Sequence, residues 1–231
     1  MANSAIEKFD EILHVLNKVG ALKRLILIGS WCLLVYREYY RNELIPVLRT
    51  MDLDFLIEKP NEKLPVVDVP KALSNLGFEL FFDVNSPLVK FERTDLEIEF
   101  LCPRLRTKDV IVNISHLNLT AQILSYMEIA QKYSKVLEYK GISLKVPEPE
   151  AFVLHKVLVY PLRGDSPKKQ KDLFTVTNLF EVIVGNQESL NRMKEIFMDF
   201  PKKMATYDFR NYKERFASNR ESINLELHPL S

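Results

Sequence analysis

The sequence predicts an α+β protein in which a mixed β-sheet flanked by helices precedes a helical C-terminal domain. Three observations support this fold class. Up to about residue 146, short apolar segments repeat with the two-residue period of strands, and segments with helical spacing lie between them. From Pro147 onward the pattern changes to helices, followed by a final thirty residues that are polar and aromatic. We therefore expect two domains, residues 1–146 and 147–231.

The first half is expected to open with three helices and two strands that alternate along the chain. Ser4 and Glu7 form a capping box, and Gly20 is a plausible end for a helix over residues 4–19. The next expected elements, in chain order, are a buried strand at 25–28, a helix at 31–41, an alternating strand at 51–57, and a short helix from Pro70 to about Gly77.

The rest of this half favours strands. Residues 78–84, 88–93 and 96–101 each have strand character, and Thr94-Asp95 is a suitable turn between the last two. A helix is expected at 120–132, and a second hairpin is expected from strands 136–139 and 142–146 around Lys140-Gly141. In the helical half we expect helices at 149–160, 168–184 and 188–200.

Composition excludes several classes of protein. Hydrophobic residues make up 47% of the 231 residues and charged residues 27%, which is typical of a globular protein and argues against disorder. The 32 basic and 31 acidic residues nearly cancel, so no global field favours nucleic acid or an anionic membrane.

The same sequence argues against export and membrane insertion. The acidic N-terminus does not resemble a signal peptide, and the apolar stretch 25–36 is too short to span a bilayer. Cys32 and Cys102 are the only cysteines, and free thiols are the default in a reducing compartment. We therefore expect a cytoplasmic protein without a membrane partner.

Gly29-Ser30 is the first candidate element of a functional site. It lies between a buried strand and a helix, where backbone N–H groups at a helix N-terminus can hold phosphate oxygens. Glycine also permits close approach of the backbone. Read in isolation, such a pair is more often a simple turn.

Asp52 and Asp54 are the second element. Side chains at i and i+2 on a strand point the same way, roughly 6.5–7 Å apart. Such carboxylates repel unless a cation lies between them, although an exposed, solvated strand face is the alternative explanation.

Glu97 and Glu99 form a second alternating acidic pair, in Leu96-Glu97-Ile98-Glu99. A third carboxylate on a neighbouring strand is what a two-magnesium phosphoryl-transfer site needs. Glu99 lies deeper in the apolar run and is preferred, but either glutamate could serve.

Together these motifs resemble the nucleotidyltransferase superfamily, which contains DNA polymerase beta and the antibiotic and toxin nucleotidyltransferases. The resemblance is carried by four segments: Leu27-Ile28-Gly29-Ser30, Met51-Asp52-Leu53-Asp54-Phe55, Ile98-Glu99-Phe100, and residues 146–156 with the later Arg163 and Lys171-Asp172. The last of these is similar to a segment in uncharacterised bacterial members and in the abortive-infection toxin branch.

The resemblance implies a fold, an activity and a set of site residues. Asp52, Asp54 and Glu99 would bind Mg²⁺ and act in catalysis. Gly29, Ser30, Lys156, Arg163 and Lys171 would bind a nucleoside triphosphate, most plausibly ATP. The implied reaction moves a nucleoside monophosphate onto an acceptor hydroxyl and releases pyrophosphate.

The acceptor stays open among a small molecule, tRNA and protein. A toxin acting on tRNA or protein, with an antitoxin partner, is one alternative function. A non-catalytic nucleotide-binding protein on the same fold is the other.

Overall fold

The computed structural model describes residues 2–42, 45, 51–82, 89–94, 96–105, 109–160 and 167–199. Its helices are α1 (Ala2–Lys18), α2 (Cys32–Tyr40), α3 (Val69–Ser74), α4 (Met127–Lys132), α5 (Pro149–Val159), α6 (Pro167–Val184), α7 (Gln187–Met198), and the short 3-10 helices η1 (Leu22–Arg24) and η2 (Ser115–Leu117). Its strands are β1 (Leu25–Ile28), β2 (Asp52–Ile57), β3 (Glu79–Phe82), β4 (Val89–Arg93), β5 (Leu96–Pro103), β6 (Ile111–Ile114), β7 (Leu119–Leu124), β8 (Ser134–Tyr139) and β9 (Ile142–Pro147).

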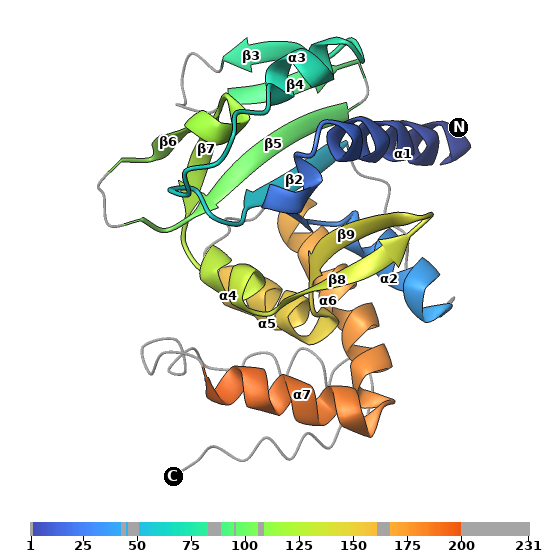
Figure 1. The fold of residues 1–231 in the computed structure, drawn as a ribbon. Coiled ribbons are helices and arrows are strands. Elements are labelled where there is room, and N and C mark those ends of the chain that lie inside the picture. Colours follow the sequence, from blue (N-terminus) through green and yellow to red (C-terminus); the bar gives the residue numbers. More distant parts are fainter. Residues whose placement is uncertain are drawn as a thin grey trace.

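The central sheet is mixed, and the described residues contribute seven strands to it (Figure 1). Its main path runs β1-β2-β5-β4-β3, with β2 and β5 parallel and the other neighbours on that path antiparallel. Strand β5 is long enough to pair with β4 along its first half and with β7 along its second half. Strands β8 and β9 form a separate hairpin.

The two faces of the sheet have different environments. On one face, Leu53, Phe55, Ile98 and Phe100 are buried in the main hydrophobic core together with residues of α1 and α2. On the other face, Leu56 and Leu101 pack with Met127 of α4. The carboxylates at the start of β2 and β5 lie on this second face, because side chains alternate along a strand.

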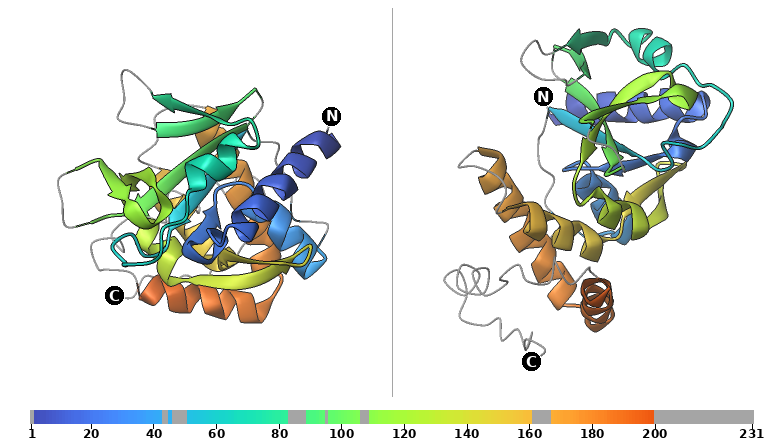
Figure 2. Two further views of the ribbon diagram at one scale, coloured as in Figure 1. Left: turned by 45° about the horizontal axis from the view of Figure 1, so that its top comes forward. Right: turned by 90° about the vertical axis from the view of Figure 1, so that its left-hand side faces the viewer.

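Helices α5, α6 and α7 lie on one side of the molecule, far from β3 and β4 (Figures 1 and 2). The main core nevertheless continues into them through Phe152, Val153 and Leu179. A buried hydrogen bond of 2.7 Å, from the Tyr36 hydroxyl to the Pro147 carbonyl, joins α2 to the end of β9. Residues on both sides of the boundary predicted at 146/147 therefore share one core.

The predicted α+β class is confirmed, but the helix predicted at 120–132 is wrong in its first half. Residues 119–124 form β7, which pairs with β6 and β5, and only 127–132 are helical. Strand β6 was not predicted. The short apolar run fits the period of a strand as well as that of a helix. Its pairing with β5 in the tertiary structure makes it a strand.

The start of the first helix also differs from the prediction. Helix α1 begins at Ala2, so Ser4 lies inside its first turn and not at the cap. The short helix predicted to end near Gly77 ends at Ser74, and the other predicted helices and strands are found within one or two residues of their expected bounds wherever the structure describes them. Residues 200–231, the end of the predicted second domain, lie outside the described residues.

Candidate active site

Four carboxylates share one face of two neighbouring strands. The parallel register of β2 and β5 sets Asp52 opposite Glu97 and Asp54 opposite Glu99. Neighbouring strands lie about 4.8 Å apart, and directly paired residues point to the same face. All four side chains are partly exposed, whereas Leu53 and Ile98 between them are buried on the opposite face.

Gly29 and Asp54 are in close contact. A Cβ atom built on Gly29 would lie only 2.4 Å from Asp54 Oδ2. Gly29 also has a φ of +73°, in the left-handed region where a side chain is strained. The Gly29-Ser30 turn is therefore held directly beside the Asp54 carboxylate, and Ser30, like Gly29, is partly exposed.

Lys90 of β4 binds both glutamates of β5. Its Nζ lies 2.7 Å from Glu99 Oε1 and 2.9 Å from Glu97 Oε2. Burial disfavours the charged ammonium, but the hydrogen bonds to Glu99 and Glu97 outweigh it and raise the pKa of Lys90 above its ordinary range. Lys90 is therefore a fixed positive charge within the acidic cluster.

The donor set suits a hard divalent cation, since Asp52 and Asp54 offer carboxylate oxygens from one face of one strand. Among the described residues, however, no three His, Cys, Asp or Glu side chains gather into a ready metal-binding group. The ion pairs of Glu97 and Glu99 with Lys90 give a physical reason, because they hold both glutamates toward β4.

Lys156 lies on α5 and pairs with Asp172 of α6. Its Nζ donates a buried hydrogen bond of 2.7 Å to Asp172 Oδ1, and the two side chains are only 11% and 7% exposed. The positive charge of Lys156 also acts on Cys32, at the start of α2. Helix α5 also packs on α2, since the rings of Phe152 and Tyr36 meet edge to face with their centres 6.0 Å apart.

The two cysteines are core residues. Burial raises the pKa of Cys32 far above its ordinary range, with the Lys156 charge opposing this shift and the Asp54 charge adding to it. Burial also raises the pKa of Cys102 to about 11. Both thiols stay protonated near neutral pH, so neither is placed to act as a nucleophile.

The structure gives less information on two predicted nucleotide-binding residues, Lys171 and Arg163. Lys171 lies in α6, one position before Asp172. Arg163 lies outside the described residues, as do Arg49 and Thr50 just before the aspartates.

Sequence reasoning missed Lys90, although a signal was available. A hairpin turning at Thr94-Asp95 sets Arg93 opposite Leu96, and counting outward in steps of one then sets Lys90 opposite Glu99. The predicted hairpin thus already contained this pairing.

The mixed sheet and the acidic face beside the Gly29-Ser30 turn define an α+β protein with a candidate active site on β2 and β5. Residues 7–198 match the family model described as nucleotidyltransferase, which is most of the chain. The protein belongs to this nucleotidyltransferase family.

Solved structures are similar to this chain in fold. The antibiotic-resistance factor ANT(2'')-Ia in solution has 12% sequence identity and a TM-score of 0.50, and the match covers 92% of this chain and 100% of that one. An antigenic nucleotidyltransferase-like protein from Paracoccidioides brasiliensis has 16% identity and a TM-score of 0.44, with 91% of each chain covered. ANT(2'')-Ia in complex with adenylyl-2''-tobramycin has 12% identity and a TM-score of 0.47, covering 84% of this chain and 97% of that one. No curated protein gives a significant match.

Each of the described helices is too short or too polar to cross a membrane.

Proposed function

We propose that this protein is a Mg²⁺-dependent nucleotidyltransferase that transfers a nucleoside monophosphate from ATP to an acceptor hydroxyl. One observation carries the proposal: Asp52 and Asp54 share the face of β2, and Asp54 lies against the Gly29-Ser30 turn. A carboxylate pair beside a backbone turn that leads into a helix combines ligands for a hard cation with a cradle for phosphate.

In the proposed reaction, the acceptor oxygen forms a bond to the α-phosphorus, and the bond from that phosphorus to the bridging oxygen breaks. Pyrophosphate leaves with the electron pair, and a carboxylate oxygen takes the hydroxyl proton, with Glu99 as the candidate. Bound Mg²⁺ would supply charge neutralisation on the triphosphate and make the acceptor hydroxyl more acidic. Asp52 and Asp54 would hold it.

Nucleotide binding is proposed for residues on three elements. Gly29 and Ser30 would contact the phosphates through the backbone, since a side chain at position 29 would collide with Asp54. Lys156, with Arg163 and Lys171, would add positive charge. The support for Lys156 is its place on α5, which packs through Phe152 against Tyr36 of α2, the helix that follows the Gly29-Ser30 turn.

The acceptor is proposed to be a small molecule, tRNA or protein in the cytoplasm, where the buried thiols of Cys32 and Cys102 would stay reduced. Incubation with α-labelled ATP and Mg²⁺ in cell extract, followed by separation into these three fractions, identifies the acceptor. Growth arrest on expression, relieved by a neighbouring gene, would favour the toxin alternative with its antitoxin.

The decisive test replaces the aspartates. Asp52→Asn and Asp54→Asn keep the side-chain shape, and each is expected to reduce label transfer by at least about a hundredfold. Neither should lower thermal stability, since each relieves repulsion between carboxylates. Asp10→Asn is the control, because Asp10 bonds to Tyr139 and Lys140 away from the β2 carboxylates. Full activity in Asp54→Asn would refute the assignment.

A further inference from the structure

The proposed reaction assigns no role to Lys90, although this residue lies beside the candidate acids. It lies directly opposite Glu99 in the antiparallel β4–β5 register, and Asp54 lies opposite Glu99 on the other side in the β2–β5 register. Glu99 is thus the middle of a row across three strands, with an ammonium on one side and a carboxylate on the other.

The ion pairs show which neighbour Glu99 binds. Its Oε1 lies 2.7 Å from Lys90 Nζ, and the two side chains are 18% and 21% exposed. Glu97 reaches the same ammonium at 2.9 Å. Charge-assisted hydrogen bonds at these distances are strong, and partial burial reduces their screening by water.

Lys90 and a divalent cation would compete for the carboxylate of Glu99, because Lys90 Nζ already binds Glu99 Oε1. A cation held by Asp52 and Asp54 would gain a third carboxylate only if Glu99 turned from Lys90 toward β2. Separating Glu99 from Lys90 would leave a partly buried ammonium with one fewer partner, which is unfavourable.

We propose that Lys90 is a positioning residue that holds Glu99 on the β4 side and thereby weakens divalent-cation binding to the nucleotide-free protein. This inference rests on the proposed function, because it takes Asp52 and Asp54 as the cation ligands. The cation would then be bound tightly only together with the triphosphate, whose oxygens supply further ligands.

The test is a titration of the nucleotide-free protein with Mn²⁺, with free Mn²⁺ measured by electron paramagnetic resonance. Lys90→Met releases Glu99 and is expected to bind Mn²⁺ about tenfold more tightly than wild type, the size expected on removing one competing charge-assisted hydrogen bond. Lys90→Arg keeps the positive charge and should bind Mn²⁺ as wild type does.

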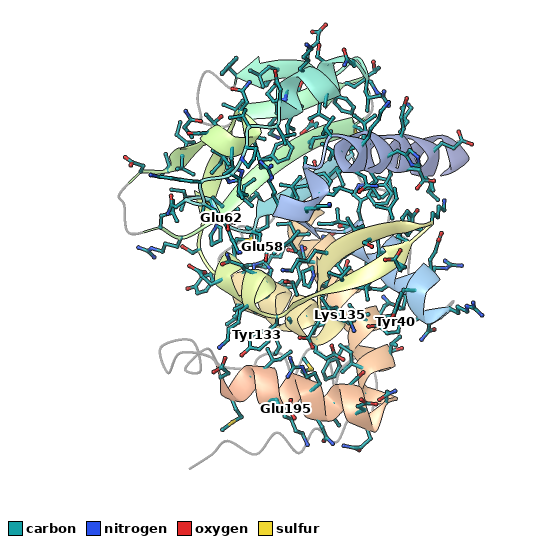
Figure 3. All side chains as sticks on the ribbon, viewed as in Figure 1. Tyr40, Glu58, Glu62, Tyr133, Lys135 and Glu195 are labelled. Atoms are coloured by element: carbon teal, nitrogen blue, oxygen red, sulfur yellow. The ribbon has the colours of Figure 1, made fainter. Side chains whose placement is uncertain are left out.

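Lys145→Met is a matched control. Lys145 pairs with Glu58 at 2.5 Å, and these side chains are 26% and 23% exposed. Glu58 follows the far end of β2 (Figure 3), roughly 20 Å along the strand from Asp52. Losing this pair should leave Mn²⁺ affinity unchanged.

A double variant identifies the carboxylate. Glu99→Gln should change Mn²⁺ affinity little in the wild-type background and should abolish the gain in Lys90→Met. Unchanged or weaker Mn²⁺ binding by a folded Lys90→Met protein would overturn the proposal, as would an equal gain in Lys145→Met. Should Lys90→Met fail to fold, Lys90→Gln is the replacement.

These results are separable from a failure of the proposed function. Mn²⁺ binding is measured without nucleotide or transfer, whereas the function is tested by label transfer in the aspartate variants. If Lys90→Met binds Mn²⁺ more tightly than wild type but the protein shows no label transfer, the result supports the role of Lys90 and not the proposed function.

Discussion

At the scale of single residues, the contact between Gly29 and Asp54 has the clearest functional consequence. The antiparallel register sets Ile28 opposite Asp54, so the chain turns into α2 directly beside this carboxylate. Only glycine fits, because of both the positive φ and the space that Asp54 Oδ2 occupies. The sequence motif is thus explained by geometry as well as by resemblance.

Gly29→Ala is expected to destabilise the protein and to impair transfer. The left-handed φ alone costs an alanine about 1–2 kcal/mol, and the added methyl group must also displace Asp54. The free energy of unfolding, measured by urea denaturation, should therefore fall by more than this amount. Label transfer should fall at least about tenfold, because a carboxylate misplaced by 1 Å loses most of its effect.

Gly141→Ala is the control for this prediction. Gly141 has a similar φ of +78°, but no atom lies within 4 Å of a Cβ built there. This variant should lose only the conformational part of the stability and keep wild-type transfer. Equal losses of activity in both variants would show that the Asp54 contact is unimportant.

At the scale of elements, the pair of Lys156 and Asp172 joins α5 to α6. Both side chains are nearly buried, and Lys156 Nζ also lies 5.6 Å from the centre of the Phe152 ring. A buried pair adds little net stability over apolar residues, but breaking it leaves a charge without compensation. The pair therefore restricts which substitutions α5 and α6 tolerate.

Asp172→Ala should lower the free energy of unfolding by about 3 kcal/mol, since it leaves a buried ammonium behind. The double variant Lys156→Met with Asp172→Leu should recover most of that loss. Glu62→Ala, which breaks the exposed pair with Lys59, should cost less than about 0.5 kcal/mol. Urea denaturation measures all three.

The same double variant separates structure from nucleotide binding. If Lys156 contributes charge to the triphosphate site, the folded double variant should bind ATP at least about tenfold more weakly by calorimetry. Unchanged ATP affinity would restrict Lys156 to a structural role.

At the scale of the whole molecule, Arg192 attaches α7 to the rest of the protein. It donates two hydrogen bonds, of 2.7 and 2.8 Å, to the carboxylate of Glu148, the residue just before α5. It also lies over the ring of Tyr133 and bonds to Glu195, both labelled in Figure 3. One side chain thus links α7, the start of α5 and the end of α4.

This contact predicts a pH-dependent contribution to stability. Hydrogen bonds from Arg192 lower the pKa of Glu148, against the opposing effect of burial. Because the folded-state pKa is the lower one, the contribution is fully present above the ordinary value of 4.5 and is lost as pH falls through the folded-state value.

Arg192→Met should therefore be less stable than wild type at pH 7, by about 1 kcal/mol, since the pair is bidentate but partly exposed. The difference should shrink as the pH falls below 4.5 and through the lowered folded-state pKa of Glu148. Thermal unfolding at a series of pH values measures it, with Lys194→Met, at an exposed position of α7, as the control. A difference that is independent of pH would contradict the assignment to Glu148.

Local sequence patterns were enough to predict the fold class, most helices and strands, and the residue types of the candidate site. Periodicity reports which side chains face a core, and Asp52, Asp54, Glu97 and Glu99 are visible as acids alternating with apolar residues. Even the position of Lys90 follows from the turn of one hairpin.

The remaining features depend on contacts between elements that are distant in sequence. Residues 119–124 form a strand because they pair with β5, a partner that is distant in sequence. The contact of Asp54 with Gly29 and the pair of Lys156 with Asp172 likewise join separate elements. Local patterns specify which face of a strand or helix a side chain lies on. The contacts between charged side chains of separate elements depend on how those elements pack.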